Sequence, residues 1–277
     1  MIPFDFEYYR PVSMQVAIQM YDELNEQGKK VIYYSGGTEF ITFARLNQMS
    51  TEAVIDIKGI PDCHVLESKG DQLVIGSAVS LNMITNSGLF PLLGETVKNI
   101  ADHTSRNKIT LGGNIMSQLI YRESVLPLLV ADAKVRLFGN EGDEIVPLAD
   151  IFRERLNLNP NQFLVQIIVD KDYVSLPFSS IKKTKMTKVG YPVVSVAALV
   201  MDSKIRAAFS GINEYPFRST EIEKVLNDSS LTEKERADQA VKYLPSPVIE
   251  DIQASAEYRE FVFCNVIEET IKALEAK

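Results

Sequence analysis

Cysteine, histidine and tryptophan are scarce in this sequence, whose 277 residues contain two, two and none of them, respectively. The two cysteines, Cys63 and Cys264, are too few for a disulfide scaffold or for a self-contained iron–sulfur or zinc site, which takes about four ligands. The two histidines, His64 and His103, lie 39 positions apart and lack the spacing of a metal-binding pair. We therefore predict no metal site on this chain and expect both cysteines to be packing residues.

Positive charge and long apolar segments are also in short supply. The chain has 29 lysine and arginine residues against 37 aspartate and glutamate residues, which gives a net charge of −8. This balance argues against nonspecific binding to nucleic acid or to anionic membranes. There is no run of about 18 apolar residues that would predict a membrane-spanning helix. Residues 1–7 lack the basic and apolar regions of a secretory signal, so we expect a soluble, cytoplasmic protein.

Apolar residues are plentiful enough for a well-buried core, since they make up 45% of the chain. Apolar positions at helical spacing predict a helix over residues 13–27. Short apolar runs predict strands over residues 31–34, 53–57 and 73–79. Ser80 is placed to cap a helix that follows the last of these strands.

The pattern of elements changes after about residue 172. Before this point strands and helices are mixed, and after it two strong apolar strand patterns precede a series of helices. One helix is expected to open at Ser219 with a box-like Glu223, and a long terminal helix is expected over residues 258–276, with Phe261 among its apolar positions. We therefore predict an α/β ligand-binding region followed by an α+β region.

Two glycine-rich segments each follow an apolar run. Residues 33–40 read Tyr-Tyr-Ser-Gly-Gly-Thr-Glu-Phe, and residues 110–114 read Thr-Leu-Gly-Gly-Asn. Glycine has no Cβ, so these turns can adopt positive φ and bring backbone amides close to a ligand. Successive amides in such a turn form a concavity that suits phosphate oxygens. Two such turns, with threonine and asparagine as neighbours, suggest two loops that close on one diphosphate of a nucleotide cofactor.

Neither segment matches the common nucleotide-binding motifs. The Gly-Lys-Ser/Thr ending of a P-loop is absent, and so is the G-x-G-x-x-G spacing of an NAD-binding Rossmann domain. Taken alone, the first segment is interpreted equally well as an ordinary strand-to-helix turn. The choice between a ligand loop and a plain turn therefore depends on the rest of the sequence.

The residues that lead into the second segment are more specific. Residues 100–114 read Ile-Ala-Asp-His-Thr-Ser-Arg-Asn-Lys-Ile-Thr-Leu-Gly-Gly-Asn, which fits the pattern I-A-x-x-x-x-R-x-x-x-T-I-G-G-N. Here the chain resembles the FAD-binding subunit or domain of the molybdenum hydroxylases, a family that includes xanthine dehydrogenase, aerobic carbon monoxide dehydrogenase and nicotinate dehydrogenase. The first segment resembles the A-G-G-T-D/E-L motif of the same family. The resemblance extends over essentially the whole chain.

The resemblance implies a fold and a domain organisation. The fold would be α+β, with a two-part PCMH-type FAD-binding domain over residues 1–172, whose subdomains cover about 1–52 and 53–172. A smaller α+β domain of the carbon monoxide dehydrogenase flavoprotein type would follow over residues 173–277. Within this fold, the two glycine segments would clamp the FAD pyrophosphate from opposite sides with backbone amides, and Thr and Asn side chains of the second would add hydrogen bonds.

The resemblance also implies which residues contact FAD, while the redox centre would be the flavin and not a catalytic side chain. Ile100, Leu164 and Lys182 match positions near the flavin, and Glu123 matches a carboxylate that contacts the cofactor. The full set of implied cofactor-binding residues is Tyr33, Tyr34, Ser35, Gly36, Gly37, Thr38, Glu39, Phe40, Ile100, Thr110, Leu111, Gly112, Gly113, Asn114, Glu123, Leu164 and Lys182.

The sequence departs from the family pattern near the flavin ring. The family has an aspartate where this chain has Glu123, which is one methylene longer. A cation at Lys182 would favour a reduced, anionic flavin. The family's Gly-Asp-Tyr-Ala segment is replaced by Gly-Tyr-Pro at residues 190–192, so Tyr191 either stacks on the ring or is a loop tyrosine before proline. We expect Arg106 to brace the second loop and not to bind phosphate.

The resemblance implies that FAD receives electrons here and passes them on, because flavin supplies redox chemistry that the protein positions and tunes. Electrons would come from a molybdopterin-containing large subunit through the 2Fe–2S clusters of a small subunit and would leave to NAD or another acceptor. This chain would be the medium subunit of a heterotrimer, which would form a dimer of heterotrimers. The alternatives are a stand-alone flavin oxidoreductase of a related FAD fold and a flavin-free scaffolding relative.

Overall fold

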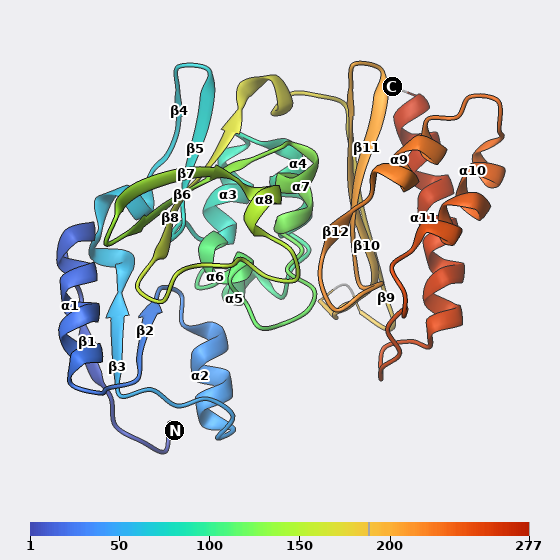
Figure 1. The fold of residues 1–277 in the computed structure, drawn as a ribbon. Helices are drawn as coiled ribbons and strands as arrows, with labels where there is room; N and C mark the ends of the chain where they lie inside the picture. Colours follow the sequence, from blue (N-terminus) through green and yellow to red (C-terminus); the bar gives the residue numbers. More distant parts are fainter. Residues whose placement is uncertain (188, 277) are drawn as a thin grey trace.

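The computed structural model describes residues 1–187 and 189–276, and within these ranges the strands form three separate sheets. Helices accompany every sheet, so the α+β fold class expected from the sequence is confirmed. Figure 1 shows the N-terminal parallel sheet in blue, the central antiparallel sheet beside it, and the C-terminal sheet with its orange and red helices at the far end. The parts therefore follow one another in space as they do in sequence.

The N-terminal sheet is parallel because a crossover connection separates its strands. In spatial order its strands are β1 (Glu7–Tyr9), β3 (Ala53–Asp56) and β2 (Val31–Tyr34). Helix α1 (Met14–Glu26) connects β1 to β2, and the Ser13 hydroxyl caps it by accepting a hydrogen bond from the Val16 amide. Helix α2 (Thr38–Arg45) follows β2. The first glycine segment is thus the turn between β2 and α2.

The central sheet is antiparallel and has the strand order β4-β5-β8-β6-β7. Its strands are β4 (Leu66–Lys69), β5 (Gln72–Gly76), β6 (Lys134–Gly139), β7 (Gly142–Pro147) and β8 (Phe163–Asp170). The helices of this region are α3 (Leu81–Ser87), α4 (Pro91–Val97), α5 (His103–Arg106), α6 (Leu111–Ile115), α7 (Val125–Val130) and α8 (Leu148–Ile151). Sheet and helices share one apolar core that includes Leu93, Leu128 and Ile167. The second glycine segment lies among these helices.

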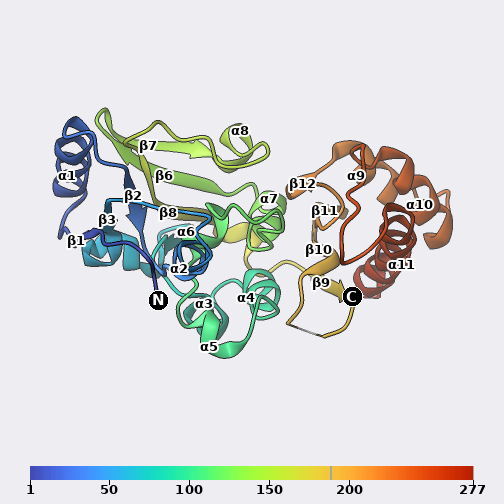
Figure 2. The ribbon, with the colours of Figure 1, turned by 90° about the horizontal axis from the view of Figure 1, so that it is seen from below.

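The C-terminal sheet is antiparallel and has the strand order β12-β11-β10-β9. Its strands are β9 (Phe178–Thr184), β10 (Pro192–Met201), β11 (Lys204–Ser210) and β12 (Phe217–Arg218). Helices α9 (Thr220–Leu226), α10 (Glu233–Ala240) and α11 (Ala256–Glu275) cover one face of the sheet (Figure 2). Phe209 and Phe263 pack edge to face between this sheet and α11, with ring centroids 5.1 Å apart.

The opposite face of the C-terminal sheet packs against helices α4 and α7 of the central region. Ala197, Leu199 and Ala208 lie on this face and belong to the same apolar core as the central helices. Small side chains allow close approach, and burial of apolar surface stabilises the contact. Strand β9 of this sheet also contributes Lys182 to the cavity described below.

Most elements begin and end near the predicted positions, and three expectations are wrong. The strand expected over residues 73–79 ends at Gly76, because the chain turns there and the Val79 amide donates back to the Gly76 carbonyl. Glu223 does not complete a capping box. Its carboxylate instead accepts hydrogen bonds from the Ala207 amide and from Arg218. Phe261 is 61% exposed and is therefore not a packing position of the terminal helix.

Candidate functional site

The first glycine segment forms a tight turn at the end of β2. Gly37 is in the left-handed region with φ +70 and is the N-cap residue of α2, which no side chain caps with a hydrogen bond. A Cβ placed on Gly36 would lie 1.9 Å from the carbonyl oxygen of Lys108 and 3.4 Å from the methyl carbon of Thr110. Only glycine fits there, because the turn is pressed against the residues that precede the second glycine segment.

The second glycine segment is the first turn of helix α6. The Thr110 hydroxyl caps this helix by accepting a hydrogen bond from the Gly113 amide at 3.2 Å. A Cβ on Gly112 would lie 2.6 Å from the Ser77 Cβ, so this glycine permits close packing on the central sheet. Leu111 is fully buried in the apolar core. The fold thus uses the apolar residue of this motif to anchor the loop.

The two glycine segments line a single cavity of about 770 Å³, a size typical of small-molecule sites. The walls include every implied cofactor-binding residue except Leu111, and they also include Tyr191. Residues from all three sheets contribute, since Tyr33 lies in β2, Leu164 in β8 and Lys182 in β9. The tertiary structure therefore brings together residues that are far apart in the sequence, such as Tyr33 and Lys182, which are separated by 149 positions.

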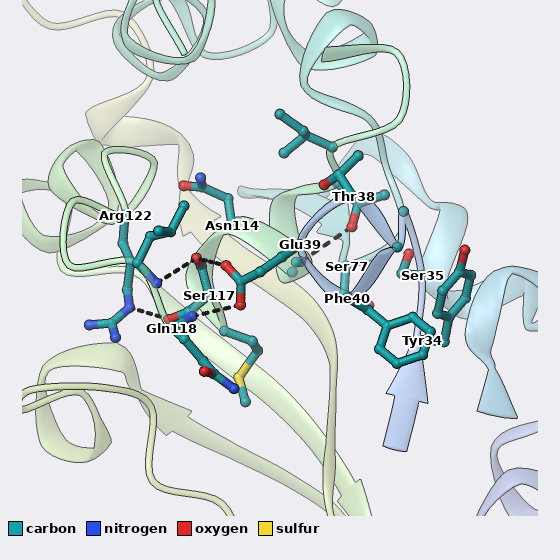
Figure 3. A pocket seen from close by; sticks show the side chains of 18 of the residues that line it. Tyr34, Ser35, Thr38, Glu39, Phe40, Ser77, Asn114, Ser117, Gln118 and Arg122 are labelled. Carbon is teal, nitrogen blue, oxygen red and sulfur yellow. Dashed lines mark hydrogen bonds between the residues drawn. The ribbon is translucent and has the colours of Figure 1, made fainter. Parts of the chain in front are cut away.

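Glu39 connects the two sides of the cavity. It is in the first turn of α2, and its carboxylate accepts hydrogen bonds from the Ser117 hydroxyl and, at 2.9 Å, from the Gln118 amide. Figure 3 shows this carboxylate directed at the segment that follows the second glycine motif. Hydrogen bonds to a charged acceptor are stronger than neutral ones. Glu39 therefore holds the first loop to the second.

The aromatic residues of the first segment build walls of the cavity. Tyr33 packs between Tyr21, at a centroid distance of 5.2 Å, and Phe163, at 4.8 Å. Its hydroxyl donates to the Asn161 carbonyl at 2.9 Å, and burial raises the pKa of this phenol. The Tyr34 hydroxyl lies so close to Gly37 that a Cβ on this glycine would be only 2.1 Å from it. These rings pack on the protein and shape the loop.

Two side chains support the second loop from its far side. Asn114 accepts hydrogen bonds from the Ser124 amide at 3.2 Å and from the Ser124 hydroxyl at 2.6 Å. Arg106 donates to the carbonyl of Ile100 at 3.0 Å and to that of Ala101 at 2.7 Å. Arg106 thus braces the lead-in to the loop, as the sequence predicts. Asn114 orders the loop through its carbonyl oxygen.

Glu123 and Lys182 form a buried ion pair at one end of the cavity. The Lys182 ammonium lies 3.0 Å from a Glu123 carboxylate oxygen and donates to the Asn99 carbonyl at 2.9 Å. Burial raises the pKa of the Glu123 carboxyl, while Lys182 acts in the opposite direction. Because Lys182 is on β9 and Glu123 directly precedes the α7 region, the pair joins the C-terminal sheet to the central region.

Tyr191 lies at the same end of the cavity and stacks on Tyr121, with ring centroids 4.8 Å apart and an angle of 16° between the rings. The Tyr121 hydroxyl donates to Asp251 at 3.3 Å, and burial raises the pKa of Tyr121 to about 12. Asp251 also accepts a hydrogen bond at 2.5 Å from Arg259, a fully buried residue of α11. Tyr191 therefore has an aromatic partner from the chain itself.

Several residues of the site carry no signal that the sequence alone reveals. Tyr121, Ser77 and Arg122 line the cavity, and Arg122 has φ 33 and donates to the Ser117 carbonyl at 2.6 Å. Lys58 contacts the first glycine segment from outside the cavity. None of these residues belongs to a motif, because each reaches the site through tertiary packing. Of these residues, only Lys58 gives a weak sequence signal, because it is a charged residue directly after the apolar run over residues 53–57.

The residues of the cavity fit an extended cofactor with an anionic centre. The first glycine turn and the uncapped N-terminus of α2 present backbone amides, which suits phosphate oxygens. The amides of residues 111–114 instead donate to Val79, Ser77 and Thr110, so the second segment does not offer the amide clamp expected from the sequence. Among the described residues, the buried Ser35 hydroxyl and one buried oxygen of Glu123 have no hydrogen-bond partner, which leaves polar groups for a ligand at the first glycine turn and at the Glu123–Lys182 end. In the same part of the chain no cluster of three or more metal-ligating side chains occurs, and no helix is long and apolar enough to cross a bilayer.

Comparison with known proteins agrees with this geometry. Residues 4–171 match the family model described as the FAD-binding domain in molybdopterin dehydrogenase. The chain is 24% identical to the glyceraldehyde dehydrogenase medium chain of Sulfolobus acidocaldarius over 271 residues, covering 94% of this chain and 92% of that one. It is 26% identical to the carbon monoxide dehydrogenase medium chain of Afipia carboxidovorans over 276 residues, covering 94% and 93%.

The fold has the same relatives. Superposition on carbon monoxide dehydrogenase from Hydrogenophaga pseudoflava, in a form that lacks the Mo-pyranopterin moiety of its cofactor, gives a TM-score of 0.88 at 25% identity and covers 100% of this chain and 99% of that chain. The region matched by the family model contains both glycine segments and most of the residues that line the cavity between them. This chain therefore belongs to the family of FAD-binding oxidoreductase subunits of the molybdopterin dehydrogenases.

Proposed function

We propose that this chain is the electron-transfer subunit of a molybdenum hydroxylase complex, in which its FAD accepts electrons from the 2Fe–2S clusters of a partner subunit. The observation that carries the proposal is the pair of glycine turns, which face one cavity and are held together by Glu39. When bound, FAD supplies the ability to exchange one or two electrons, and the protein holds and orients it.

In this proposal, different groups of the implied residues bind different parts of the cofactor. Backbone amides of residues 35–38 bind the diphosphate, and the free Ser35 hydroxyl adds a hydrogen bond. The amides of residues 111–114 already donate hydrogen bonds within the chain, so the second segment forms the opposite wall. Ile100 and Leu164 contribute buried apolar surface beside the flavin. Lys182 and Glu123 face the ring end, where the unpaired Glu123 oxygen accepts a hydrogen bond from the cofactor. Tyr191 closes this end together with Tyr121.

The metal centres belong to other subunits in this proposal. With two cysteines in the sequence and no metal-ligating cluster among the described residues, the chain has too few ligands for a 2Fe–2S cluster. The relatives named above are medium chains of dehydrogenases. A small 2Fe–2S subunit, a large molybdopterin subunit and a dimer of the resulting heterotrimers complete the proposed assembly, with NAD or another acceptor as the exit for electrons.

We also propose a division of the chain near residue 172, with subdomains that meet near residue 52. Two observations support it. The central sheet ends with β8 at Asp170, and the next strand, β9, begins the C-terminal sheet at Phe178. The first 52 residues pack into two smaller apolar clusters apart from the central core, around Ala17 and around Phe40, and both clusters also contain residues of β3. The cavity lies where these three parts meet.

The test is to express the chain alone and together with the products of neighbouring open reading frames that encode a small cysteine-rich subunit and a large subunit. The proposal expects a flavin spectrum for the complex, co-purification of a cysteine-rich subunit, and bleaching of the flavin when a substrate of the large subunit is added. A flavin that turns over a substrate without any partner would support a stand-alone flavin oxidoreductase instead. A colourless complex that takes up no FAD would support a scaffolding role.

A further inference from the structure

Lys58 contacts the backbone of the first glycine loop and the ring of Tyr34. Its ammonium donates to the Ser35 carbonyl at 2.5 Å and is 4.7 Å from the centroid of the Tyr34 ring. It does not line the cavity, whereas Ser35 and Gly36 do. The lysine therefore touches the backbone of the loop and leaves the ligand space free.

The contact with Ser35 sets the direction of a backbone amide. The Ser35–Gly36 peptide bond is trans, so the Ser35 carbonyl and the Gly36 amide point in opposite directions across one plane. Because Lys58 holds the carbonyl, the Gly36 amide is turned away from Lys58. The same glycine is wedged against the Lys108 carbonyl by its missing Cβ. The orientation of this peptide is thus determined from two sides.

Lys58 is itself held firmly. Its ammonium lies 2.8 Å from a carboxylate oxygen of Asp56, whose side chain is 1% exposed. The other oxygen of Asp56 accepts a hydrogen bond from the Lys58 amide at 2.9 Å, and the Tyr8 hydroxyl also donates to this carboxylate. The His64 ring is 2.9 Å from the Lys58 carbonyl. A long side chain that is fixed in this way loses little further entropy when a ligand binds.

We propose that Lys58 is a positioning residue for the diphosphate of the cofactor: it orients the Ser35–Gly36 peptide toward the phosphate oxygens. The inference rests on the proposed binding of the diphosphate by the first glycine segment. Loss of a hydrogen bond from a charged group corresponds to roughly a 10- to 100-fold change in an equilibrium constant. Lys58→Met is therefore expected to weaken FAD binding by about that factor.

The experiment measures dissociation constants of the unliganded full-length chain for FAD and for riboflavin, which has no phosphate. The variants are Lys58→Met, Lys58→Arg and, as a matched control, Lys69→Met on the exposed strand β4. We expect Lys58→Met to weaken FAD binding at least tenfold with riboflavin within twofold of wild type. Lys58→Arg keeps the charge and should recover most of the FAD affinity, and Lys69→Met should bind as wild type.

A second variant separates positioning from simple neutralisation of the buried Asp56. Asp56→Asn/Lys58→Met removes both charges, so it should fold as well as wild type and still bind FAD weakly. If the double variant regains wild-type FAD affinity, or if FAD and riboflavin weaken equally in Lys58→Met, the inference is wrong. If wild type and Lys58→Met bind FAD with equal affinity, only this inference is overturned. A wild-type chain that does not bind FAD overturns the proposed function as well.

Discussion

Removal of one member of the buried Glu123–Lys182 pair gives the sharpest test of how the cavity is held together. Lys182→Met keeps most of the length of the side chain and deletes the ammonium that lies 3.0 Å from the Glu123 carboxylate. A carboxylate left buried without its partner costs about 3–5 kcal/mol of folding stability. In a protein of this size, each kcal/mol of lost stability lowers the melting temperature by about 2–4 °C, so Lys182→Met should lower it by roughly 6–20 °C.

The pH dependence gives this prediction a definite sign. Burial already raises the pKa of the Glu123 carboxyl above its ordinary value of 4.5, and loss of Lys182 removes the opposing influence. At pH values between the pKa of Glu123 in the unfolded chain and its higher pKa in the folded chain, the native state binds more protons than the unfolded state. The free energy of unfolding therefore falls as the pH rises through this range. The destabilisation by Lys182→Met should therefore be small near pH 4.5 and should grow toward neutral pH.

The assay is chemical denaturation of the unliganded chain at several pH values, with wild type, Lys182→Met, Glu123→Gln and the double variant. The double variant has no unpaired buried charge, so it should regain most of the stability that either single variant loses. Lys98→Met is the control, because the Lys98–Glu95 pair is exposed and worth little. Equal destabilisation by Lys182→Met at acid and neutral pH would refute the reasoning.

Three further predictions concern the two loops and the thiols. Gly36→Ala places a Cβ 1.9 Å from a backbone carbonyl, so the purified variant should lose its visible flavin absorbance while retaining its far-UV circular dichroism. Glu39→Gln replaces charge-assisted hydrogen bonds between the loops by neutral ones and should weaken FAD binding about tenfold, whereas Glu67→Gln on β4 should not, as measured by fluorescence titration. Burial raises the pKa of the Cys63 thiol to about 12, so this thiol should react with a disulfide reagent only after unfolding, and rapid reaction in the native state would contradict the structure.

The local elements of the fold could be predicted because local signals agree with them. The strand at Val31–Tyr34 and the helix capped by Ser13 follow from hydrophobic periodicity and capping chemistry. Strand β9 is not predicted from the sequence, because its lysine-rich segment does not resemble a buried strand. It forms because Ser179 and Ile181 pair with Ala198 and Val196 of β10. A partner strand of this kind is invisible to a reading of one segment.

Departures from prediction have the same origin. Phe261 has the spacing of an apolar helix face and is nevertheless exposed, where it stacks on Tyr258 at a centroid distance of 6.2 Å. Glu223 has nearly the spacing of a capping box, yet Arg218 and the Ala207 amide of β11 take its carboxylate. In each case a tertiary neighbour, and not the local pattern, decides what the side chain contacts.

The sequence by itself determined the glycine turns and the family, because a missing Cβ and a motif of fixed spacing are properties of a short segment. Only the tertiary structure decided that Leu111 faces the core, that Glu39 ties the loops together and that Glu123 and Lys182 pair. Lys58 became visible in the same way, through its contact with the Ser35 carbonyl. The reason is physical: hydrogen bonds and ion pairs depend on distances between atoms, and residues far apart in the chain acquire those distances only when the three sheets pack around one cavity.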